Sequence, residues 1–393
     1  MGLFLFLLIT EALTLVVLYQ HFYNSARVIY FISTFFNILL SIWLWILFIR
    51  ITLYKGDFDT PQNIWLRMNL TGMICGVVVP RFILAMFHFT GKLIKIKKGS
   101  HLRSLTYTGL VISFIIFMIV AFGTIVGRFN FKTEVVTLKI KGLSKNLDDF
   151  KIVQLSDIHL PGFYHHRSLL EKVMNDINSY KPDLVINTGD FITYGWKEFD
   201  RSDTILSIAK GRYGNFAVLG NHDIGTYHPS FTEADREKNI SEMNLLIPAS
   251  GYTILNDENL ILDIAGEKVA IIGVITSGRH PGMIHGDLKK AMVGTDSSDL
   301  KLLLAHDPNQ WEEDVKVKTD IDITFSGHTH GMQMGILTKK FKWSPSQYFY
   351  SHWSGLYTSG NQYHYVNRGL GVLAIPFRIW MPPEITIIIL KAD

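Results

Sequence analysis

Cysteine is nearly absent from this sequence: its 393 residues include only Cys75. A single thiol excludes a disulfide framework within the chain and any metal site built from several cysteines. Charge of one sign is also scarce, because the formal net charge is only +4 at pH 7. Such a weak balance argues against nucleic acid as a partner. The length allows more than one domain and a sizeable core.

Charge is missing most completely from the long apolar runs in the first third of the chain. A bilayer crossing takes roughly 20 residues, and four runs reach that length, at residues 3–22, 28–49, 68–89 and 105–126. The second and fourth carry no charge, whereas the first contains Glu11 and the third contains Arg81. Arg81 could meet Glu11 or a lipid phosphate, but we expect it to snorkel to the membrane surface, or the span to be shorter than residues 68–89.

The loop between the third and fourth runs has no acidic residue. Its basic residues are Lys92, Lys95, Lys97, Lys98 and Arg103. By the positive-inside rule this loop is cytoplasmic, so the fourth span runs outward. We therefore predict a multi-pass protein of the cytoplasmic or plasma membrane. It would have a four-helix region over residues 1–127 and a second domain over residues 128–393 on the extracytoplasmic side.

The second domain has a different texture from the first third. Short apolar runs bounded by Gly, Asp and Asn alternate with polar, helix-like segments such as residues 167–177. Runs of four to eight aliphatic residues with such borders are typical of buried strands. The alternation predicts an α/β domain.

Five of the predicted strands end in side chains that bind cations. In chain order these are Asp157 and His159, Asp190, Asn221 with His222 and Asp223, His306 with Asp307, and His328 with His330. In an extended segment, residues two apart face the same side, so each Asp-x-His or His-x-His pair can direct two ligands at one point. Open α/β sheets collect function at the carboxyl ends of their strands. One such end would be a turn or a helix cap, but five together predict a metal site.

The number of candidate donors exceeds what one ion takes. Three side chains offer oxygen and four offer imidazole nitrogen: Asp157, Asp190, Asn221, His159, His306, His328 and His330. This set suits two ions that share a carboxylate, which would make a hydroxide from a bridging water and neutralise a phosphoryl group under attack. A mixed nitrogen and oxygen site without thiolate favours Mn, Fe, Zn or Mg.

The motifs resemble the calcineurin-like metallophosphoesterase family. The blocks D-x-H, G-D, G-N-H-D, H and G-H-x-H occur in the family's order between Asp157 and His330. The C-terminal segment "YVNRGLGVLAIPFRIWMPPEITIIIL" resembles the membrane-associated branch that includes UDP-2,3-diacylglucosamine hydrolase-like enzymes. The resemblance implies an αββα sandwich, in which two sheets are flanked by helices. The chain departs from protein phosphatases because no D-R follows its G-D block.

The resemblance also implies roles for individual residues. The first metal would be held by Asp157, His159, Asp190 and His330. The second metal would be held by Asp190, Asn221, His306 and His328, with Asp190 bridging the two. His222 would face the substrate and stabilise the phosphoryl charge or protonate the leaving oxygen. Asp223 would either orient His222 or cap a helix.

Three further features allow two interpretations each. Arg368 could contact phosphate or serve the structure, and His165 could contact substrate or belong to a surface histidine pair. The aromatic stretch over residues 341–357 could rest at a membrane interface, where Trp and Tyr are enriched, or pack in the second sheet.

The sequence thus predicts a membrane-anchored dimetal phosphoesterase. Its substrate is expected to be a phosphodiester or pyrophosphate on a lipid-linked molecule, such as a UDP-diacylglucosamine-like compound or another phospholipid. The alternatives are a broad phosphoesterase acting on soluble phosphate esters and an inactive membrane sensor, which the complete ligand set disfavours. The sequence gives no indication of oligomeric state.

Overall fold

The computed structural model describes residues 2–98, 103–276, 286–338 and 340–393. Residues 99–102 of the predicted basic loop lie outside this range. The described chain forms two compact units, and it passes from one to the other after Gly56, Trp65, Val126, Leu373 and Ile379. The predicted boundary at 127/128 is one residue from the third of these passages. Two short segments, 57–65 and 374–379, belong to the unit opposite to the one expected.

The first unit covers residues 2–56, 66–126 and 374–379 where the structure describes them, and we call it the membrane unit. It consists mainly of apolar helices. They are α1 (Gly2–Phe22), α2 (Arg27–Thr52), α3 (Pro61–Met73), α4 (Val79–Lys98) and α5 (Arg103–Ile125), with the π-helical turn η1 (Ile74–Val78) between α3 and α4. Four helical stretches are long and apolar enough to cross a membrane, because α3, η1 and α4 run on as one. The four predicted spans are confirmed in this sense.

The second unit covers residues 57–65, 127–373 and 380–393 where the structure describes them. Its first sheet follows the order β1-β14-β2-β3-β4-β5. Its strands are β1 (Lys132–Ile140), β2 (Lys151–Leu155), β3 (Leu184–Asn187), β4 (Asn215–Ala217), β5 (Thr253–Ile254) and β14 (Glu384–Ala392). β2, β3, β4 and β5 pair in parallel. Their carboxyl ends therefore share one edge of the sheet.

The second sheet follows the order β12-β13-β9-β8-β7-β6. Its strands are β6 (Glu258–Ile264), β7 (Glu267–Val274), β8 (Leu300–Ala305), β9 (Ile323–Ser326), β12 (Gly355–Ser359) and β13 (Gln362–Val366). β7, β8, β9 and β13 are parallel. A small hairpin pairs β10 (Ile336–Leu337) with β11 (Lys342–Trp343).

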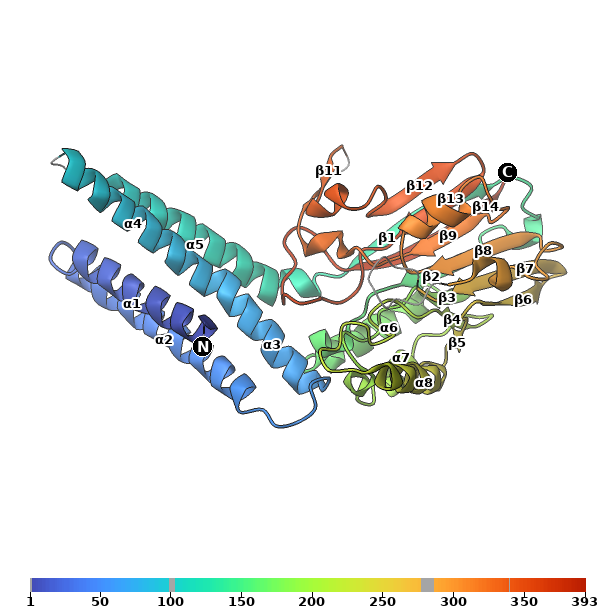
Figure 1. Cartoon of the computed structure of the whole chain (residues 1–393). Helices are drawn as coiled ribbons and strands as arrows, with labels where there is room; N and C mark the ends of the chain where they lie inside the picture. The colour runs from blue at the N-terminus through green and yellow to red at the C-terminus, as the bar shows by residue number, and fades with distance from the viewer. Residues whose placement is uncertain (1, 99–102, 277–285, 339) are drawn as a thin grey trace. The chain divides into compact units, whose positions relative to one another are not determined.

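Helices cover the outer face of each sheet, and Figure 1 shows α6 (Arg167–Ser179), α7 (Asp203–Leu206) and α8 (Glu233–Ala249) beside strands β2 to β5. One apolar cluster joins β2, β3 and β4 to these helices, and a second lies between the two sheets. A third packs β7 and β8 against α9 (Leu288–Ala291) and the π-helical turn η6 (Trp311–Val315). The layers are helix, sheet, sheet and helix, which confirms the predicted αββα fold.

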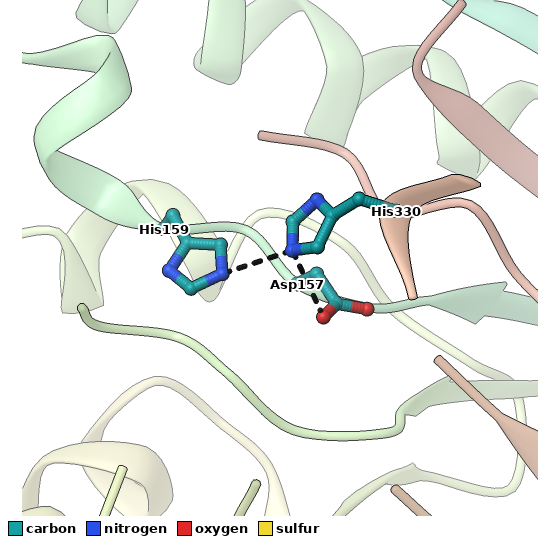
Figure 2. Close-up of side chains that lie close together, drawn as sticks. All are labelled: Asp157, His159 and His330. Carbon is teal, nitrogen blue, oxygen red and sulfur yellow. Dashed lines mark hydrogen bonds and ion pairs between the residues drawn. The ribbon is translucent and has the colours of Figure 1, made fainter. Parts of the chain in front are cut away.

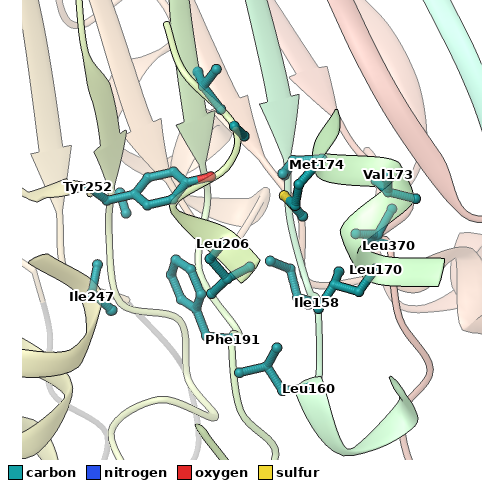
Figure 3. Packing of buried hydrophobic residues seen from close by; sticks show 14 of the residues in the cluster. Ile158, Leu160, Leu170, Val173, Met174, Phe191, Leu206, Ile247, Tyr252 and Leu370 are labelled. Atoms are coloured by element: carbon teal, nitrogen blue, oxygen red, sulfur yellow. The ribbon is translucent and has the colours of Figure 1, made fainter. Parts of the chain in front are cut away.

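Apolar residues next to the predicted ligands anchor the loops at the sheet edge. Ile158 and Leu160 flank His159, and Phe191 follows Asp190; each of the three is at most 4% exposed. Figure 3 shows them in one cluster with Leu170 of α6. Because these neighbours are fixed in close-packed surroundings, the ligand side chains between them have little freedom to move.

Candidate metal centre and active site

The predicted ligands meet where the parallel strands of both sheets end. Asp157 and His159 follow β2, Asp190 follows β3 and Asn221 follows β4. His306 follows β8 in the second sheet, and His328 and His330 follow β9. The structure thus brings together all the side chains predicted to hold metal.

The backbone at these positions is not extended. Asp157, His159, Asp190, His328 and His330 have φ values of 50°, 43°, 59°, 71° and 50°. Left-handed backbone is uncommon for residues other than glycine and is concentrated at functional sites. The argument from strand alternation therefore had the wrong local geometry, because each ligand lies in the sharp turn after its strand.

The first group of ligands is Asp157, His159 and His330, shown in Figure 2. Nε2 of His330 lies 3.2 Å from Oδ1 of Asp157 and 3.1 Å from Nε2 of His159. All three side chains are buried. One carboxylate oxygen and two imidazole nitrogens thus face a common point, which is the donor set of a divalent transition metal.

The second group is Asp190, His306 and His328. Nδ1 of His328 lies 3.2 Å from Nε2 of His306 and 2.8 Å from Oδ1 of Asn221. The two histidines of the G-H-x-H block therefore belong to different groups, as the resemblance implies.

Asp190 lies between the two groups. Its Oδ2 is 3.1 Å from Nε2 of His306 in the second group and 3.9 Å from Nε2 of His159 in the first. Gly220 permits this position, because a Cβ at residue 220 would come within 2.1 Å of Oδ1 of Asp190. The geometry fits a carboxylate that contacts two ions.

Second partners orient the imidazole rings. Nδ1 of His306 donates to the Thr188 carbonyl at 2.7 Å, and Nδ1 of His159 lies 3.2 Å from Oγ1 of Thr193. Such contacts fix the tautomer that leaves Nε2 free for a metal. His328 is oriented the other way, because its Nε2 lies 2.8 Å from the Tyr350 hydroxyl and its Nδ1 faces the second group.

The electrostatics of the cluster favour positive charge at its centre. Burial raises the pKa values of Asp157 and Asp190, but the charges of His330 and His306 outweigh it, so both values lie well below the ordinary carboxyl range. Burial lowers the pKa of His306, yet the charge of Asp190 raises it to about 10. The cluster would thus hold a proton where a cation fits.

His222 lies beside the cluster with its ring centroid 5.1 Å from that of His159. Its backbone N–H donates to Oδ1 of Asp190 at 2.9 Å, and its Nδ1 donates to the Thr193 carbonyl at 2.6 Å. Burial lowers the pKa of the His222 imidazole. Because Nδ1 is committed to a carbonyl, the proton that His222 can gain or lose is the one on Nε2.

Asp223 does not take the predicted orienting position. Its carboxylate accepts backbone N–H groups of Asp190 at 2.7 Å, Gly220 at 3.0 Å and Ile192 at 3.1 Å. Asp223 therefore holds the turns after β3 and β4 together. The ring of His222 is oriented by the Thr193 carbonyl instead.

A buried network that the sequence analysis did not identify supports Thr193. The carboxylate of Glu198 accepts backbone N–H groups of Thr193 at 2.5 Å and Tyr194 at 2.7 Å. Asn239 of α8 joins in, because its Oδ1 accepts the N–H of Trp196 at 2.8 Å and its side-chain nitrogen donates to the Asp223 carbonyl. Burial raises the pKa of Glu198 to about 8, although these N–H groups lower it.

The two predicted substrate contacts lie in other surroundings. The buried guanidinium of Arg368 pairs with Glu134 at 2.8 Å and Glu384 at 3.0 Å. This pairing agrees with the structural alternative for Arg368, not with a phosphate contact. His165 is exposed and packs edge-on against Trp65 with ring centroids 4.7 Å apart.

Comparisons with known proteins agree with this geometry. Residues 150–332 match the calcineurin-like phosphoesterase family. An uncharacterized metallophosphoesterase of Bacillus subtilis is 30% identical over 271 residues, which cover 65% of this chain and 84% of that protein. Another of Campylobacter jejuni is 32% identical over 260 residues, covering 65% of this chain and 62% of that one.

The likeness to one relative extends beyond the second unit, which holds the candidate metal ligands and which we call the catalytic unit. A protein of Danio rerio named transmembrane protein with metallophosphoesterase domain is 28% identical over 349 residues, or 85% of this chain and 75% of the relative. The matched residues 150–332 include all the candidate metal ligands described above. The chain belongs to the calcineurin-like phosphoesterase family and is a metal-dependent hydrolase of phosphate esters.

Proposed function

We propose that this protein is a membrane-anchored dimetal phosphoesterase that cleaves a phosphodiester or pyrophosphate bond in a lipid-linked substrate. The observation that carries the lipid part of the proposal is the aromatic segment beside the ligands. Tyr350 touches His328, while its neighbours Tyr348 and Phe349 are 71% and 69% exposed. An aromatic surface that begins at a metal ligand suits a substrate whose phosphate is next to apolar chains.

Two metal ions fit the two ligand groups. Asp157, His159 and His330 would hold the first, His306, His328 and Asn221 would hold the second, and Asp190 would contact both. Mn, Fe, Zn and Mg are the ions that such donors select. When bound, the pair would acidify a water between the ions and neutralise charge on the phosphoryl group.

His222 would complete the chemistry from the substrate side. Its Nδ1–H stays on the Thr193 carbonyl in either charge state, so Nε2 carries the exchangeable proton. An anionic phosphoryl group near Nε2 favours the protonated ring and offsets the effect of burial. That proton can then pass to the leaving oxygen.

The chain connections support action at a membrane. The catalytic unit is joined to the membrane unit at five points along the chain, after residues 56, 65, 126, 373 and 379. A lipid substrate confined to the same bilayer would reach the site at a high effective concentration. We further propose that the catalytic unit is extracytoplasmic, because the basic residues at the end of α4 and the start of α5, among them Lys92 and Arg103, are expected to remain in the cytoplasm.

The alternative function is hydrolysis of soluble phosphate esters, with the helices serving only for localisation. The two are separated by comparing a diacylated substrate with its deacylated counterpart in mixed micelles with Mn-loaded protein. UDP-diacylglucosamine, which has a pyrophosphate bond, and a glycerophospholipid with a phosphodiester headgroup would form two arms of the comparison. We expect a higher kcat/KM for the acylated member of at least one pair, and equal values in every pair would reject the lipid part.

A matched pair of variants tests the aromatic surface. Phe349→Ser should lower kcat/KM for the acylated substrate and leave the deacylated one unchanged. Leu245→Ser is the control, because Leu245 is 66% exposed on α8, outside the aromatic segment. Equal effects of the two variants on the acylated substrate would remove the aromatic surface from the proposal.

Membrane side is tested with a reporter fused after Asp393. A reporter that reads out only extracytoplasmic location should be active. Activity of a reporter that functions only in the cytoplasm would contradict the proposed side, and would direct the substrate search to the inner leaflet.

A further inference from the structure

Arg81 of α4 is buried inside the membrane unit, where only 4% of it is exposed. The prediction that Arg81 snorkels to the membrane surface is therefore wrong. Its Nε donates to Oδ1 of Asn37 at 3.0 Å, and its Nη2 donates to the Asn37 carbonyl at 3.0 Å and to Oγ of Ser41 at 2.6 Å. A permanently charged group held within a membrane-spanning segment is costly and is usually functional.

Within the described chain no carboxylate lies in ion-pair contact with Arg81, although the charge of Glu11 acts on it from a distance. The acid on α1, Glu11, instead accepts a hydrogen bond from the indole of Trp45 at 2.9 Å. Two donors remain over, because Nη1 of Arg81 and the side-chain nitrogen of Asn37 are buried without a hydrogen-bond partner in the described chain. Unpaired buried donors are expensive, and here they converge beside a positive charge that no carboxylate contacts within the described residues.

These donors border a cavity of about 510 Å³ within the membrane unit. Its lining is otherwise mostly apolar and includes Leu18, Leu40, Phe36 and Phe114. Phe36 and Phe114 are also 59% and 64% exposed, so the cavity reaches the outer, lipid-facing surface of the helices. The size lies within the range of about 300–1,000 Å³ that is usual for small-molecule sites.

The local backbone forms the cavity wall. The π-helical turn η1 (Ile74–Val78) precedes Pro80, and both Gly76 and Val77 of this turn line the cavity. Proline has no N–H to donate to the preceding turn, and π-helical turns often mark functional sites. The Pro80 carbonyl is satisfied by Oγ of Ser113 on α5 at 2.7 Å. The interruption places Arg81 at the cavity without leaving that carbonyl unpaired.

We propose that this cavity binds an anionic phospholipid, with the headgroup phosphate on Arg81 and Asn37 and an acyl chain along the apolar lining. The phosphate would accept hydrogen bonds from the two donors that have no protein partner. Arginine suits an oxyanion because its planar guanidinium offers several donors in one fork. The apolar wall and its exposed edge favour a lipid that enters from the bilayer over a free anion. The site is separate from the metal ligands, which all lie in the catalytic unit.

The test uses the full chain purified in detergent, with phosphatidylglycerol as the probe. Native mass spectrometry counts the lipids retained, and titration monitored by thermal unfolding gives an affinity. We expect one retained phosphatidylglycerol and a rise of Tm on titration. Phosphatidylcholine should shift Tm less, and millimolar inorganic phosphate should not shift it.

Variants assign the site. Arg81→Met should weaken phosphatidylglycerol binding by about tenfold or more, the factor expected from loss of a charge-assisted hydrogen bond. Arg50→Met is the matched control at the exposed end of α2 and should bind as wild type. Leu40→Phe retains Arg81 and fills part of the cavity, so it should also weaken binding.

Hydrolysis of a soluble phosphodiester by each variant reports that the chain is folded, since none of these residues belongs to the metal site. A purely structural Arg81 would overturn the proposal: Arg81→Met would then lower Tm without lipid and keep the same lipid-induced shift. Equal retention of phosphatidylglycerol by wild type, Arg81→Met and Leu40→Phe, or a Tm shift by inorganic phosphate alone, would also overturn it.

Discussion

The catalytic unit and the membrane unit both bury polar side chains, but the groups they leave available are opposite in kind. At the edge of the two sheets, carboxylate oxygens, an amide oxygen and imidazole nitrogens converge, and Nε2 of His159 lies 3.1 Å from Nε2 of His330. In the membrane unit, donors converge instead, because Nη1 of Arg81 and the side-chain nitrogen of Asn37 have no acceptor in the described chain. The first arrangement is built for a cation and the second for an anion.

The difference also shows in the backbone. The two ligand groups of the catalytic unit, together the acceptor cluster, are made by turns with left-handed residues, among them Asp157, Asp190 and His328. The donor cluster, formed by Arg81 and Asn37, lies on helices, and a π-helical turn precedes Pro80 next to Arg81. The sheet edges bring several loops to one point, so the catalytic unit assembles seven candidate ligands. The membrane unit gathers fewer polar groups, because Asn37 and Ser41 of α2 meet the single permanent charge of Arg81.

The largest expected effect breaks the acceptor cluster at its centre. Asp190→Ala should abolish metal binding in both groups and lower kcat/KM by roughly a thousandfold or more, because metals contribute several kcal/mol to phosphoryl transfer. His330→Ala should leave the second group able to bind an ion. Metal analysis and soluble phosphodiester hydrolysis measure both. Asp314→Ala, on the exposed surface of η6, is the control. Full metal content in Asp190→Ala would contradict the proposal that Asp190 contacts two ions.

A smaller effect separates chemistry from ligation. His222→Ala should lower kcat by about 10²–10³-fold, within the range of general acid–base catalysis, and should keep its metals. His165→Ala is the matched control, because His165 is exposed and packs on Trp65. If His222→Ala loses metal, His222 belongs to the acceptor cluster as a ligand. If the kcat of His165→Ala falls as far as that of His222→Ala, His165 contacts the substrate.

The network behind His222 gives the next effect. Glu198→Ala should lower kcat by roughly tenfold, the lower end of the loss for removal of a supporting partner, because the loop that carries the Thr193 carbonyl loses its acceptor. Metal content should stay unchanged, and Glu237→Ala on the exposed face of α8 should have no effect. Loss of metal in Glu198→Ala would assign this residue to the metal centre instead.

The same residue predicts a pH dependence of stability. Burial raises the pKa of Glu198 to about 8, well above the ordinary value of a glutamate, so the folded protein holds this proton more tightly than the unfolded chain. The stability that it contributes is therefore present at low pH and is lost as the pH rises through about 8. Between about pH 5 and about pH 9 the Tm of wild type should fall more than that of Glu198→Gln. If Tm falls equally with pH in wild type and in Glu198→Gln, the raised pKa of Glu198 is contradicted.

Much of the catalytic unit could be predicted because its signals are local. Buried strands appear as short aliphatic runs, and the cation-binding side chains follow them directly in the chain, as with Asp157 after β2 and His306 after β8. The αββα layers follow from the family resemblance. Strand alternation predicts that Asp157 and His159 share a group, although their backbone is left-handed and not extended. It fails for His328 and His330, which belong to different groups.

The features that were missed depend on contacts between distant segments. Glu198 is recognisable only once the turn after β3 folds back on η5 (Trp196–Phe199), and Asn239 acts from α8. The burial of Arg81 depends on its packing against α2 in the bundle, and hydropathy alone could not show that Asn37 would meet it. For Arg368, the sequence could not reveal the carboxylates of Glu134 and Glu384 that occupy its guanidinium.

The smallest expected effect sharpens the boundary between the acceptor cluster and its surroundings. The Tyr350 hydroxyl lies 2.8 Å from Nε2 of His328, so it orients the one ligand ring whose Nδ1 faces the second group. Tyr350→Phe retains the aromatic ring and removes the hydroxyl that makes this contact. We expect the affinity for the second metal to fall by about tenfold, at the lower end of the loss for removal of an outer partner of a ligand. At saturating Mn, kcat should fall only about threefold, since the ligand itself remains. The preference for acylated over deacylated substrate should not change, because the ring is still present.

Tyr348→Phe is the control, since Tyr348 is 71% exposed. Metal titrations followed by activity measure both quantities. An unchanged metal affinity in Tyr350→Phe would show that the hydroxyl does not support His328, and a changed acyl preference would show that it contacts the substrate instead.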